Sequence, residues 1–467
     1  MTATPNASMF EYKRKRIPHI LPAKVSGRVR RVTGLVVETT PLTLPVGSLC
    51  HIYSRLSREA IEAEVVGFRE NATLMMPLGE MRGIGPGDRV ISSTTEQVVP
   101  VGPHLLGRIL DGMGRPMDGK GPVVATATYP IYADPPDPVL RPRISEILST
   151  GIRTIDAFMT VGKGQRIGIM AGTGVGKSVL LGMLARYTQT QVSVISLVGE
   201  RGREVRDFID RDLGPEGMAR SVVVIATSDQ PAPVRVKAPF VATAVAEFFR
   251  DQGADVTLLM DTVTRMAMAQ RDIGGSIGEV AAAKGYTPST FALLPRLMER
   301  AGRSPQGSIT GFYTVLVEGD DMNEPVSDAT RGILDGHIVL SRRLAHRNQY
   351  PAIDILESIS RVQSEIVPRQ ELQAVRRLRQ VLATFKEAEE LINIGAYVPG
   401  ANPEIDKARN TMPSLLKLLQ QDMTESTPYA DTMKLAMELA ALSQQEVAIQ
   451  RRAPPPQPGG PQQQPRR

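Results

Sequence analysis

The 467-residue sequence has one cysteine, no tryptophan and no long apolar run. Cys50 cannot form an internal disulfide and has no neighbouring metal ligands, so we expect a small buried side chain in a reducing compartment. No apolar run approaches the roughly 20 residues of a transmembrane helix. The charged N-terminus has no apolar segment behind it, so no signal peptide is expected. These absences predict a cytoplasmic protein.

The excess of positive over negative charge is also small: the chain has 55 Lys and Arg residues and 49 Asp and Glu residues, which gives a net charge of +6. Much of the excess lies in residues 1–31, where eight basic residues face only Glu11. A basic arm of this kind suits anionic lipid, nucleic acid or an acidic partner, and a solvated terminus is the alternative.

The length predicts two or three domains. Residues 24–95 read as short β-branched strands broken by Gly and Pro, which predicts a small antiparallel barrel. Residues 99–142 are dense in Gly and Pro and suit an ordered linker. The last stretch, APPPQPGGPQQQPRR, is predicted to be disordered.

After residue 144, apolar runs alternate with helical patterns, as buried parallel strands do when helices cover both faces of a sheet. The predicted strands are RIGIM, VSVISLV, SVVVIAT and VTLLM. From about Gln370 the pattern is helical, with apolar residues at the spacing of one buried face. These residues are Leu372, Val375, Leu378, Leu382 and Phe385.

A glycine-rich stretch with a single lysine, AGTGVGKS, follows the strand RIGIM and precedes a helical pattern. This context predicts a phosphate-binding loop, in which inward N–H groups and a helix N-terminus hold the anion. Lys177 is expected to reach the β- and γ-phosphates of ATP, and the Ser178 hydroxyl to bind Mg²⁺. Ala171 replaces the usual first glycine, which requires only that this position has no positive φ. The predicted nucleotide-binding residues are Ala171, Gly172, Thr173, Gly174, Val175, Gly176, Lys177, Ser178 and Val179.

Two carboxylates follow apolar strands and are expected at the ligand-binding edge of the sheet. Asp261 ends DVTLLMD, where it can hold Mg²⁺ through water or, alternatively, cap the following helix. Glu200 follows VSVISLV, where a glutamate can polarise water for attack on the γ-phosphate. The spacing also allows Glu200 to be a surface residue that pairs with Arg201 or Arg203.

Nine segments occur in a fixed order between about Lys24 and Ala408. They are LGRILDGMGRPMDG, AGTGVGKS, VGERGREVRDFI, DVTLLMDTVTRMAMAQRDIG, KGYTPSTFALLPRLMERAG, GSITGFYTVLVEGDD, DGHIVLSRRLA, YPAIDILESISRV and NIGAYVPGANPEIDKA. Together they resemble the ring-forming ATPases related to rotary ATP synthase catalytic subunits, and most closely the type III protein-export ATPases of the flagellar (FliI) type.

The resemblance implies an α/β fold with a RecA-like P-loop ATPase core at 96–369. An N-terminal β-barrel at 24–95 would join subunits into a ring, and a C-terminal helical domain at 370–452 would face the export machinery. Residues 1–23 would form a basic regulator-binding arm. The Pro/Gln tail at 453–467 has no counterpart in the family.

The resemblance also implies roles for single residues. Glu200 matches the glutamate that positions the attacking water, and Arg361 in SISRV matches an arginine finger donated to the neighbouring subunit. Tyr350 matches the aromatic residue that stacks on adenine, and Arg201 is a candidate sensor of the γ-phosphate. A structural ion pair for Arg361 and a core position for Tyr350 are the alternatives. Asp320 and Asp321 match a family segment without an assigned step.

The implied activity is ATP hydrolysis with Mg²⁺, coupled to unloading and delivery of export substrates by a homohexamer. The implied partners are a FliH-like regulator at the N-terminus, a central coiled-coil stalk protein, the export gate and chaperone–substrate complexes. The implied location is the cytoplasm, peripheral to the inner face of the cell membrane.

Three alternatives share parts of this fold. A virulence type III secretion ATPase has the same chemistry, although the segments ILDGHIVLSRRLA and INIGAYVPGANPEIDKA favour the flagellar branch. A rotary ATPase subunit is disfavoured because Glu200 and Arg361 occur in one chain, which favours identical subunits. A nucleic-acid motor needs aromatic residues for base stacking, and the barrel region offers only Phe68 and Tyr53.

Overall fold

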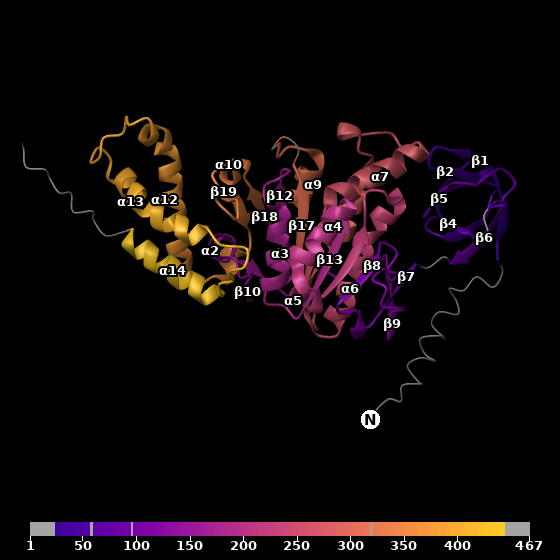
Figure 1. The fold of residues 1–467 in the computed structure, drawn as a ribbon, viewed down its shortest axis with the longest axis horizontal. Helices are drawn as coiled ribbons and strands as arrows, with labels where there is room; N and C mark the ends of the chain where they lie inside the picture. Colours follow the sequence, from indigo (N-terminus) through magenta and orange to yellow (C-terminus); the bar gives the residue numbers. More distant parts are fainter. Residues whose placement is uncertain (1–23, 57–58, 95–96, 318, 320, 444–467) are drawn as a thin grey trace, which may run out of the picture.

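The computed structural model describes residues 24–56, 59–94, 97–317, 319 and 321–443 (Figure 1). A small barrel lies at one end of the molecule, a large sheet with its helices in the middle, and three long helices at the other end. The N-terminal arm, the Pro/Gln tail and Asp320 lie outside the described residues. Within the described ranges, no helix has the length and apolar character needed to cross a membrane.

The barrel is closed by six strands, and each neighbouring pair is antiparallel, which confirms the predicted barrel. In chain order they are β1 (Ser26–Thr33), β2 (Val36–Thr39), β3 (Leu49–Tyr53), β4 (Ile61–Arg69), β5 (Ala72–Pro77) and β6 (Arg89–Thr94). Alternate side chains fill the interior, including Val37, Ile52 and Val65. Cys50 is among them, as predicted, and burial raises the pKa of its thiol to about 11.

The central sheet runs in the order β19-β18-β12-β17-β15-β13-β14-β8. These eight strands are parallel to their neighbours except β19, which is antiparallel to β18. A short ninth strand, β16 (Gly302–Arg303), pairs antiparallel with β17 beside this path. The four predicted strands are confirmed as β12 (Arg166–Ala171), β13 (Val192–Val198), β14 (Ser221–Ala226) and β15 (Asp255–Asp261). The strands that the hydrophobic runs did not predict are β8 (Arg108–Asp111), β17 (Ser308–Leu316), β18 (Gly336–Leu340) and β19 (Ile353–Ser360).

The Gly- and Pro-rich stretch expected to be a linker is ordered, and it also contributes strands. β8 forms one edge of the central sheet, and β7 (Val98–Val101) pairs with β9 (Ala127–Pro130). The remaining short elements are η2 (Pro103–Leu105), β10 (Ile147–Leu148), α2 (Arg153–Phe158), β11 (Val161–Gly162), η4 (Ala283–Gly285), β16 (Gly302–Arg303), α10 (Arg342–His346) and α11 (Gln363–Ile366).

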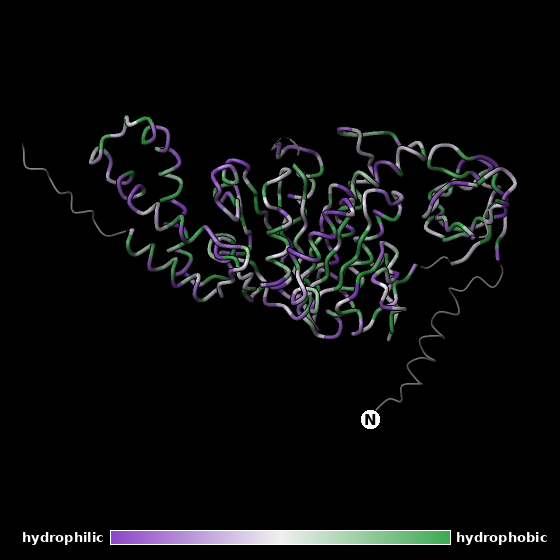
Figure 2. Tube along the Cα trace, in the orientation of Figure 1, coloured by the Kyte–Doolittle hydropathy of each residue, from purple (hydrophilic) through white to green (hydrophobic). Residues whose placement is uncertain are grey.

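Helices cover both faces of the sheet, so its inner strands contribute to two apolar cores. Along β13, Val194 belongs to the core on the α6 and α7 side and Ile195 to the core on the α3 side. Figure 2 shows the resulting concentration of apolar residues along the central strands. The covering elements are α3 (Lys177–Tyr187), α4 (Gly202–Asp207), η3 (Phe208–Leu213), α5 (Gly214–Ala219), α6 (Ala232–Asp251), α7 (Val263–Ile277), α8 (Pro288–Met298) and α9 (Pro325–Ile333).

Three helices follow the sheet: α12 (Arg369–Asn393), α13 (Pro403–Leu419) and α14 (Tyr429–Leu442). They confirm the predicted C-terminal helices. Of the five residues predicted to form the buried face of α12, Val375 and Leu378 are fully buried. The other three are only partly covered. Arg153 fixes these helices to the core, because its guanidinium donates to the carbonyl oxygens of Leu418 at 3.1 Å and Gln420 at 2.5 Å.

One buried ion pair joins the barrel to the core. Lys237 on α6 contacts the carboxylate of Glu64 on β4, and the Lys237 side chain is 1% exposed. Burial lowers the pKa of Lys237, while Glu64 attracts the charged form and opposes that shift. Gln97 donates to the other oxygen of Glu64 at 3.1 Å.

We expect Glu64→Ala to lower the free energy of unfolding by about 3–5 kcal/mol, because it leaves Lys237 buried without a counter-charge. The double variant Glu64→Leu/Lys237→Met should recover most of the loss. Glu62→Ala is the matched control: Glu62 lies on the same strand as Glu64 but pairs with Arg115, which is half-exposed, so its loss should cost less than about 1 kcal/mol. Urea denaturation followed by circular dichroism measures all three, and a double variant as unstable as Glu64→Ala would contradict the explanation.

Candidate active site

The phosphate-loop sequence connects β12 to α3 as predicted. Ala171 is the last residue of β12, and α3 begins at Lys177. Gly176 precedes the helix with φ +90°, a conformation that L side chains rarely adopt. Ala171 is not among the positive-φ residues, so its methyl group is compatible with the loop. The first N–H groups of α3 therefore face the space above the ends of the strands.

A cation lies between two carboxylates at this edge of the sheet. Lys177 Nζ is 2.5 Å from Asp261 Oδ1 and 3.2 Å from Glu200 Oε1. As predicted, both carboxylates lie at strand ends: Asp261 is the last residue of β15, and Glu200 follows β13 after Gly199. The Thr314 hydroxyl on β17 also donates to Asp261 Oδ1 at 2.7 Å and fixes that carboxylate. The three charged side chains are 5–17% exposed.

Burial and charge act against each other in this cluster. Burial alone lowers the pKa of Lys177, but attraction to Asp261 and Glu200 outweighs burial and leaves that pKa raised. Burial raises the pKa of Glu200 to about 7; Lys177 opposes the rise and Asp261 adds to it. Protonated Glu200 donates a hydrogen bond to Glu204, and this bond lowers the pKa of Glu204. Glu200 therefore gains and loses its proton near neutral pH, as a general base requires.

Arg265 is a site residue that the sequence patterns did not single out. It lies in the first turn of α7, lines the same pocket as Lys177 and Glu200, and its buried Nε has no hydrogen-bond partner within the described part of the chain. A methyl group on Gly199 would lie 2.8 Å from Arg265 Cβ, so only glycine lets the two segments approach. The sequence does contain a signal for this residue: Arg265 stands four positions after Asp261, in the first turn of the helix that follows β15.

The open pocket at this edge has a volume of about 690 Å³, within the range of small-molecule sites. The phosphate loop, Glu200 and Arg265 line it. Arg201 also lines the pocket, but its side chain is 82% exposed, and its Nη1 lies 3.8 Å from Glu204 Oε1. Ser178 is exposed to the pocket as the second residue of α3.

Tyr350 lies beside the phosphate loop although it is distant in sequence. A methyl group built on Gly176 would be 3.5 Å from the Tyr350 ring, and the residue is 42% exposed. An exposed aromatic face next to a phosphate loop offers a stacking surface for a base attached to the bound phosphates. The backbone N–H of Gln421, just beyond α13, donates to the Tyr350 carbonyl at 2.9 Å.

Arg361 lies at the opposite edge of the sheet. Ala171 pairs with Leu340 on β18, whereas the Arg361 N–H donates to the Asp335 carbonyl, at the level where β12 and β18 begin. The five residues from Asp335 to Leu340 put Arg361 roughly 17 Å from the phosphate-loop edge, measured along the strands. Its side chain is exposed, donates only to the Arg331 carbonyl at 3.3 Å, and has no carboxylate partner in the described ranges.

Oxygen ligands of the type that Mg²⁺ prefers are present beside the phosphate loop. Among the described residues, no group of three or more His, Cys, Asp or Glu side chains gathers to hold a metal ion. The Ser178 hydroxyl and the Asp261 carboxylate, at the ends of adjoining elements, are the oxygen types that Mg²⁺ prefers. Phosphate oxygens of a nucleotide would have to supply further ligands.

Residues 151–360 match the family model of the ATP synthase alpha/beta nucleotide-binding domain, and residues 367–437 match the C-terminal domain of the type III secretion ATPase EscN. The chain is 53% identical to the flagellum-specific ATP synthase of Bacillus subtilis, over 85% of this chain and 91% of the relative. It is 48% identical to the type 3 secretion system ATPase of Xanthomonas euvesicatoria, over 88% of this chain and 92% of the relative.

A solved structure gives the same result for the fold. The assembled ATPase EscN of enteropathogenic E. coli, in complex with its central stalk EscO, matches with a TM-score of 0.82 and 40% identity. The match covers 89% of this chain and all of the solved one. The likeness therefore includes the barrel and the C-terminal helices as well as the sheet.

We expect kcat/KM for MgATP hydrolysis to fall below about pH 7, because the pKa of Glu200 is raised to about 7 and only the deprotonated form accepts a proton. Glu200→Gln should lower kcat by at least about 100-fold and leave MgATP binding intact. It should also abolish the fall of kcat/KM at low pH, the acid limb of the pH profile. Glu204→Gln should move this fall in activity to lower pH, since it replaces a charged acceptor that favours protonated Glu200 by an amide that can donate a hydrogen bond to ionised Glu200. An unchanged limb in Glu200→Gln would contradict the role of Glu200.

Proposed function

The chain belongs to the type III protein-export ATPases, a branch of the ATP synthase alpha/beta family, and we propose that it is the ATPase of a flagellar export apparatus. It is an enzyme that hydrolyses ATP in support of protein export. The identity of 53% to a flagellar relative, against 48% to a secretion-system relative, supports the flagellar branch. The observation that carries the catalytic proposal is the Lys177–Asp261–Glu200 cluster at the end of a phosphate loop.

Nucleotide binding would redirect Lys177. In the structure its ammonium group pairs with two carboxylates, and a triphosphate in the loop would offer it more numerous and more highly charged oxygen partners. We propose that Tyr350 stacks on the adenine, because its exposed ring lies beside Gly176. Ser178 and Asp261 would hold Mg²⁺, which neutralises charge on the phosphates when bound.

Glu200 would then orient and deprotonate the attacking water. When Lys177 turns to the phosphates, Glu200 loses a cation that lowers its pKa, so its affinity for a proton rises as the substrate binds. Arg265, with a buried unsatisfied Nε, and the exposed Arg201 both line the pocket, and we propose that they contact the γ-phosphate from its walls. Each guanidinium would stabilise charge that develops during phosphoryl transfer.

Arg361 cannot reach the nucleotide bound by its own chain, because the sheet separates them. Its exposed guanidinium has no carboxylate partner among the described residues, so it is available to an adjacent copy. We propose that it acts as an arginine finger on the neighbouring subunit's nucleotide, where it supplies charge that the site otherwise lacks. Each active site would then be shared by two subunits.

A closed ring satisfies this arrangement with identical interfaces, and we propose a homohexamer. The EscN structure is of an assembled ATPase with a central stalk, which supports a ring and a coiled-coil stalk partner here. The remaining partners stay proposals: a FliH-like regulator on the N-terminal arm, the export gate, and chaperone–substrate complexes. We also propose that the protein acts at the cytoplasmic face of the cell membrane, which it contacts peripherally.

Mixing two inactive variants tests the shared site. Arg361→Ala and Lys177→Ala should each abolish most hydrolysis when assayed alone. In mixed rings, the intact phosphate loop of one variant meets the intact finger of the other at about a quarter of the interfaces. We expect the mixture to regain a matching fraction of wild-type ATPase activity. No recovery at any mixing ratio would argue against a finger donated in trans.

Deleting the gene tests the export system. If the protein serves flagellar export, the deletion strain should lose swimming motility and external filaments, and wild-type protein but not Glu200→Gln should restore both. A deletion strain that swims normally and fails to secrete virulence effectors would instead assign the chain to a secretion system of the Xanthomonas type.

A further inference from the structure

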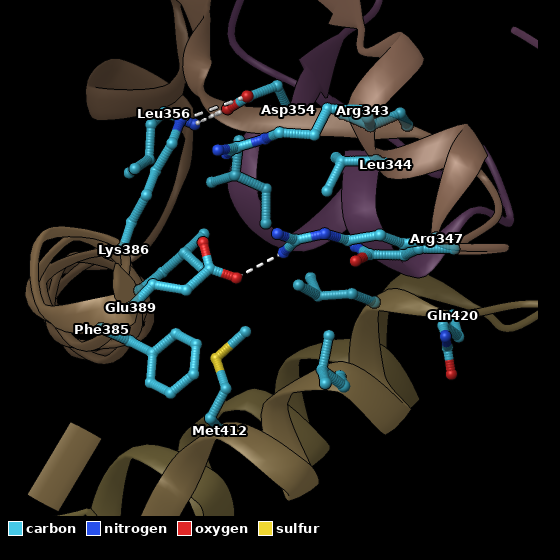
Figure 3. A pocket seen from close by; sticks show the side chains of 16 residues that line it. Arg343, Leu344, Arg347, Asp354, Leu356, Phe385, Lys386, Glu389, Met412 and Gln420 are labelled. Atoms are coloured by element: carbon cyan, nitrogen blue, oxygen red, sulfur yellow. Dashed lines mark hydrogen bonds and ion pairs between the residues drawn. The ribbon is translucent and has the colours of Figure 1, made fainter. Parts of the chain in front are cut away.

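A second pocket lies between the core and the C-terminal helices, away from the phosphate loop (Figure 3). Its walls come from α10 and β19 on the core side and from α12 and α13 on the helical side. Its volume of about 300 Å³ is at the lower end of the range for small-molecule sites, roughly 300–1,000 Å³.

The apolar wall of this pocket consists of side chains that the fold leaves partly uncovered. Leu382 and Phe385, predicted to be core residues of α12, line the pocket and are only half-buried. Figure 3 shows Phe385 and Met412 below the cavity and Leu356 across from them. Leu416 of α13 completes this surface. The pocket thus presents an apolar floor wide enough for a ring or a short hydrocarbon.

The charged residues around this floor leave one cation without a partner. Arg347 pairs with Glu389, and Lys386 pairs with Asp354 at 3.4 Å, so both carboxylates are neutralised. Arg343 extends across the cavity from α10 and has no ion pair or side-chain hydrogen bond to any residue that the structure describes. Three basic and two acidic side chains therefore leave one positive charge facing an apolar surface.

We propose that this pocket binds a small organic anion with an apolar body, its acidic group on Arg343 and its rings or chain on Leu356, Phe385, Met412 and Leu416. A guanidinium offers paired N–H donors that match a carboxylate, sulfonate or phosphate group. An uncharged ligand would leave Arg343 unpaired, and an inorganic anion would leave the apolar floor uncovered. A molecule that carries both features therefore matches the site best.

The pocket adjoins the element that positions Tyr350. Gln349 lines the pocket and is the neighbour of Tyr350 in the chain, while Gln420 lines it and is the neighbour of Gln421. Gln421 in turn donates to the Tyr350 carbonyl. A ligand that moves Gln349 or Gln420 would shift this contact, and, on the proposed stacking of Tyr350 on adenine, its binding would be coupled to ATP binding with a reciprocal effect on each affinity.

The test uses anilinonaphthalene sulfonate, an aromatic anion whose fluorescence rises in apolar sites, titrated into the full-length protein with saturating MgADP. We expect one saturable site in the wild type. Arg343→Gln should bind the sulfonate with about tenfold lower affinity. Leu416→Trp should not bind it, because the larger side chain fills the cavity. Arg376→Gln, an exposed arginine on α12 outside this pocket, is the matched control and should bind as the wild type does. Phenylnaphthylamine, which has the same rings without the sulfonate, should bind wild type and Arg343→Gln alike.

Equal affinity of the sulfonate for wild type and Arg343→Gln, or no saturable binding to the wild type, would overturn the proposal. The coupling is measured separately: saturating sulfonate should change KM for ATP by at least about threefold in the wild type and leave KM of Arg343→Gln unchanged. An unchanged wild-type KM would overturn the coupling. The binding titration measures no hydrolysis, so its result stands apart from the proposed export function.

Discussion

Strand direction in the central sheet determines where every functional side chain lies. Parallel strands β12, β13 and β15 end at one edge, so the phosphate loop, Glu200 and Asp261 meet there although they are far apart in sequence. β19 runs the other way and carries Arg361 to the opposite edge. If Arg361 acts as the proposed finger, the chain holds both halves of a hydrolytic site at opposite ends of its strands and does not bring them together by itself. A second copy whose Arg361 edge faces this phosphate-loop edge would complete the site.

The charges around Lys177 favour a change of its ion-pair partners, from Asp261 and Glu200 to the phosphates of a bound nucleotide. Burying one cation and two carboxylates is costly unless their charges offset one another, and the contacts of Lys177 with both carboxylates at 2.5 and 3.2 Å offset part of the charge. The cluster keeps one excess negative charge next to the phosphate loop, which a bound metal ion and the turn of Lys177 toward phosphate would rebalance. Glu200, with its pKa near 7, is the member whose protonation responds most readily to that change.

Much of the fold and half of the site could be predicted from local sequence. The strands β12 to β15 are continuous apolar runs, and AGTGVGKS between a strand and a helix has few other structural meanings. β8 was missed because its four residues stand among glycines and prolines, and pairing with β14 rather than propensity makes it a strand. Leu382 and Phe385 follow the helical period of buried residues, but the pocket beside α10 leaves them partly open. The edge that Arg361 occupies depends on the reversal of β19, which no local pattern reveals.

The shared site is tested most directly by measuring native mass and ATP turnover per chain on the same samples over a wide range of protein concentration. The shared-site account predicts that the monomer binds MgATP but barely hydrolyses it, and that turnover rises together with a species of six times the monomer mass. A strictly monomeric sample that hydrolyses ATP at the full rate of the assembled protein would contradict it.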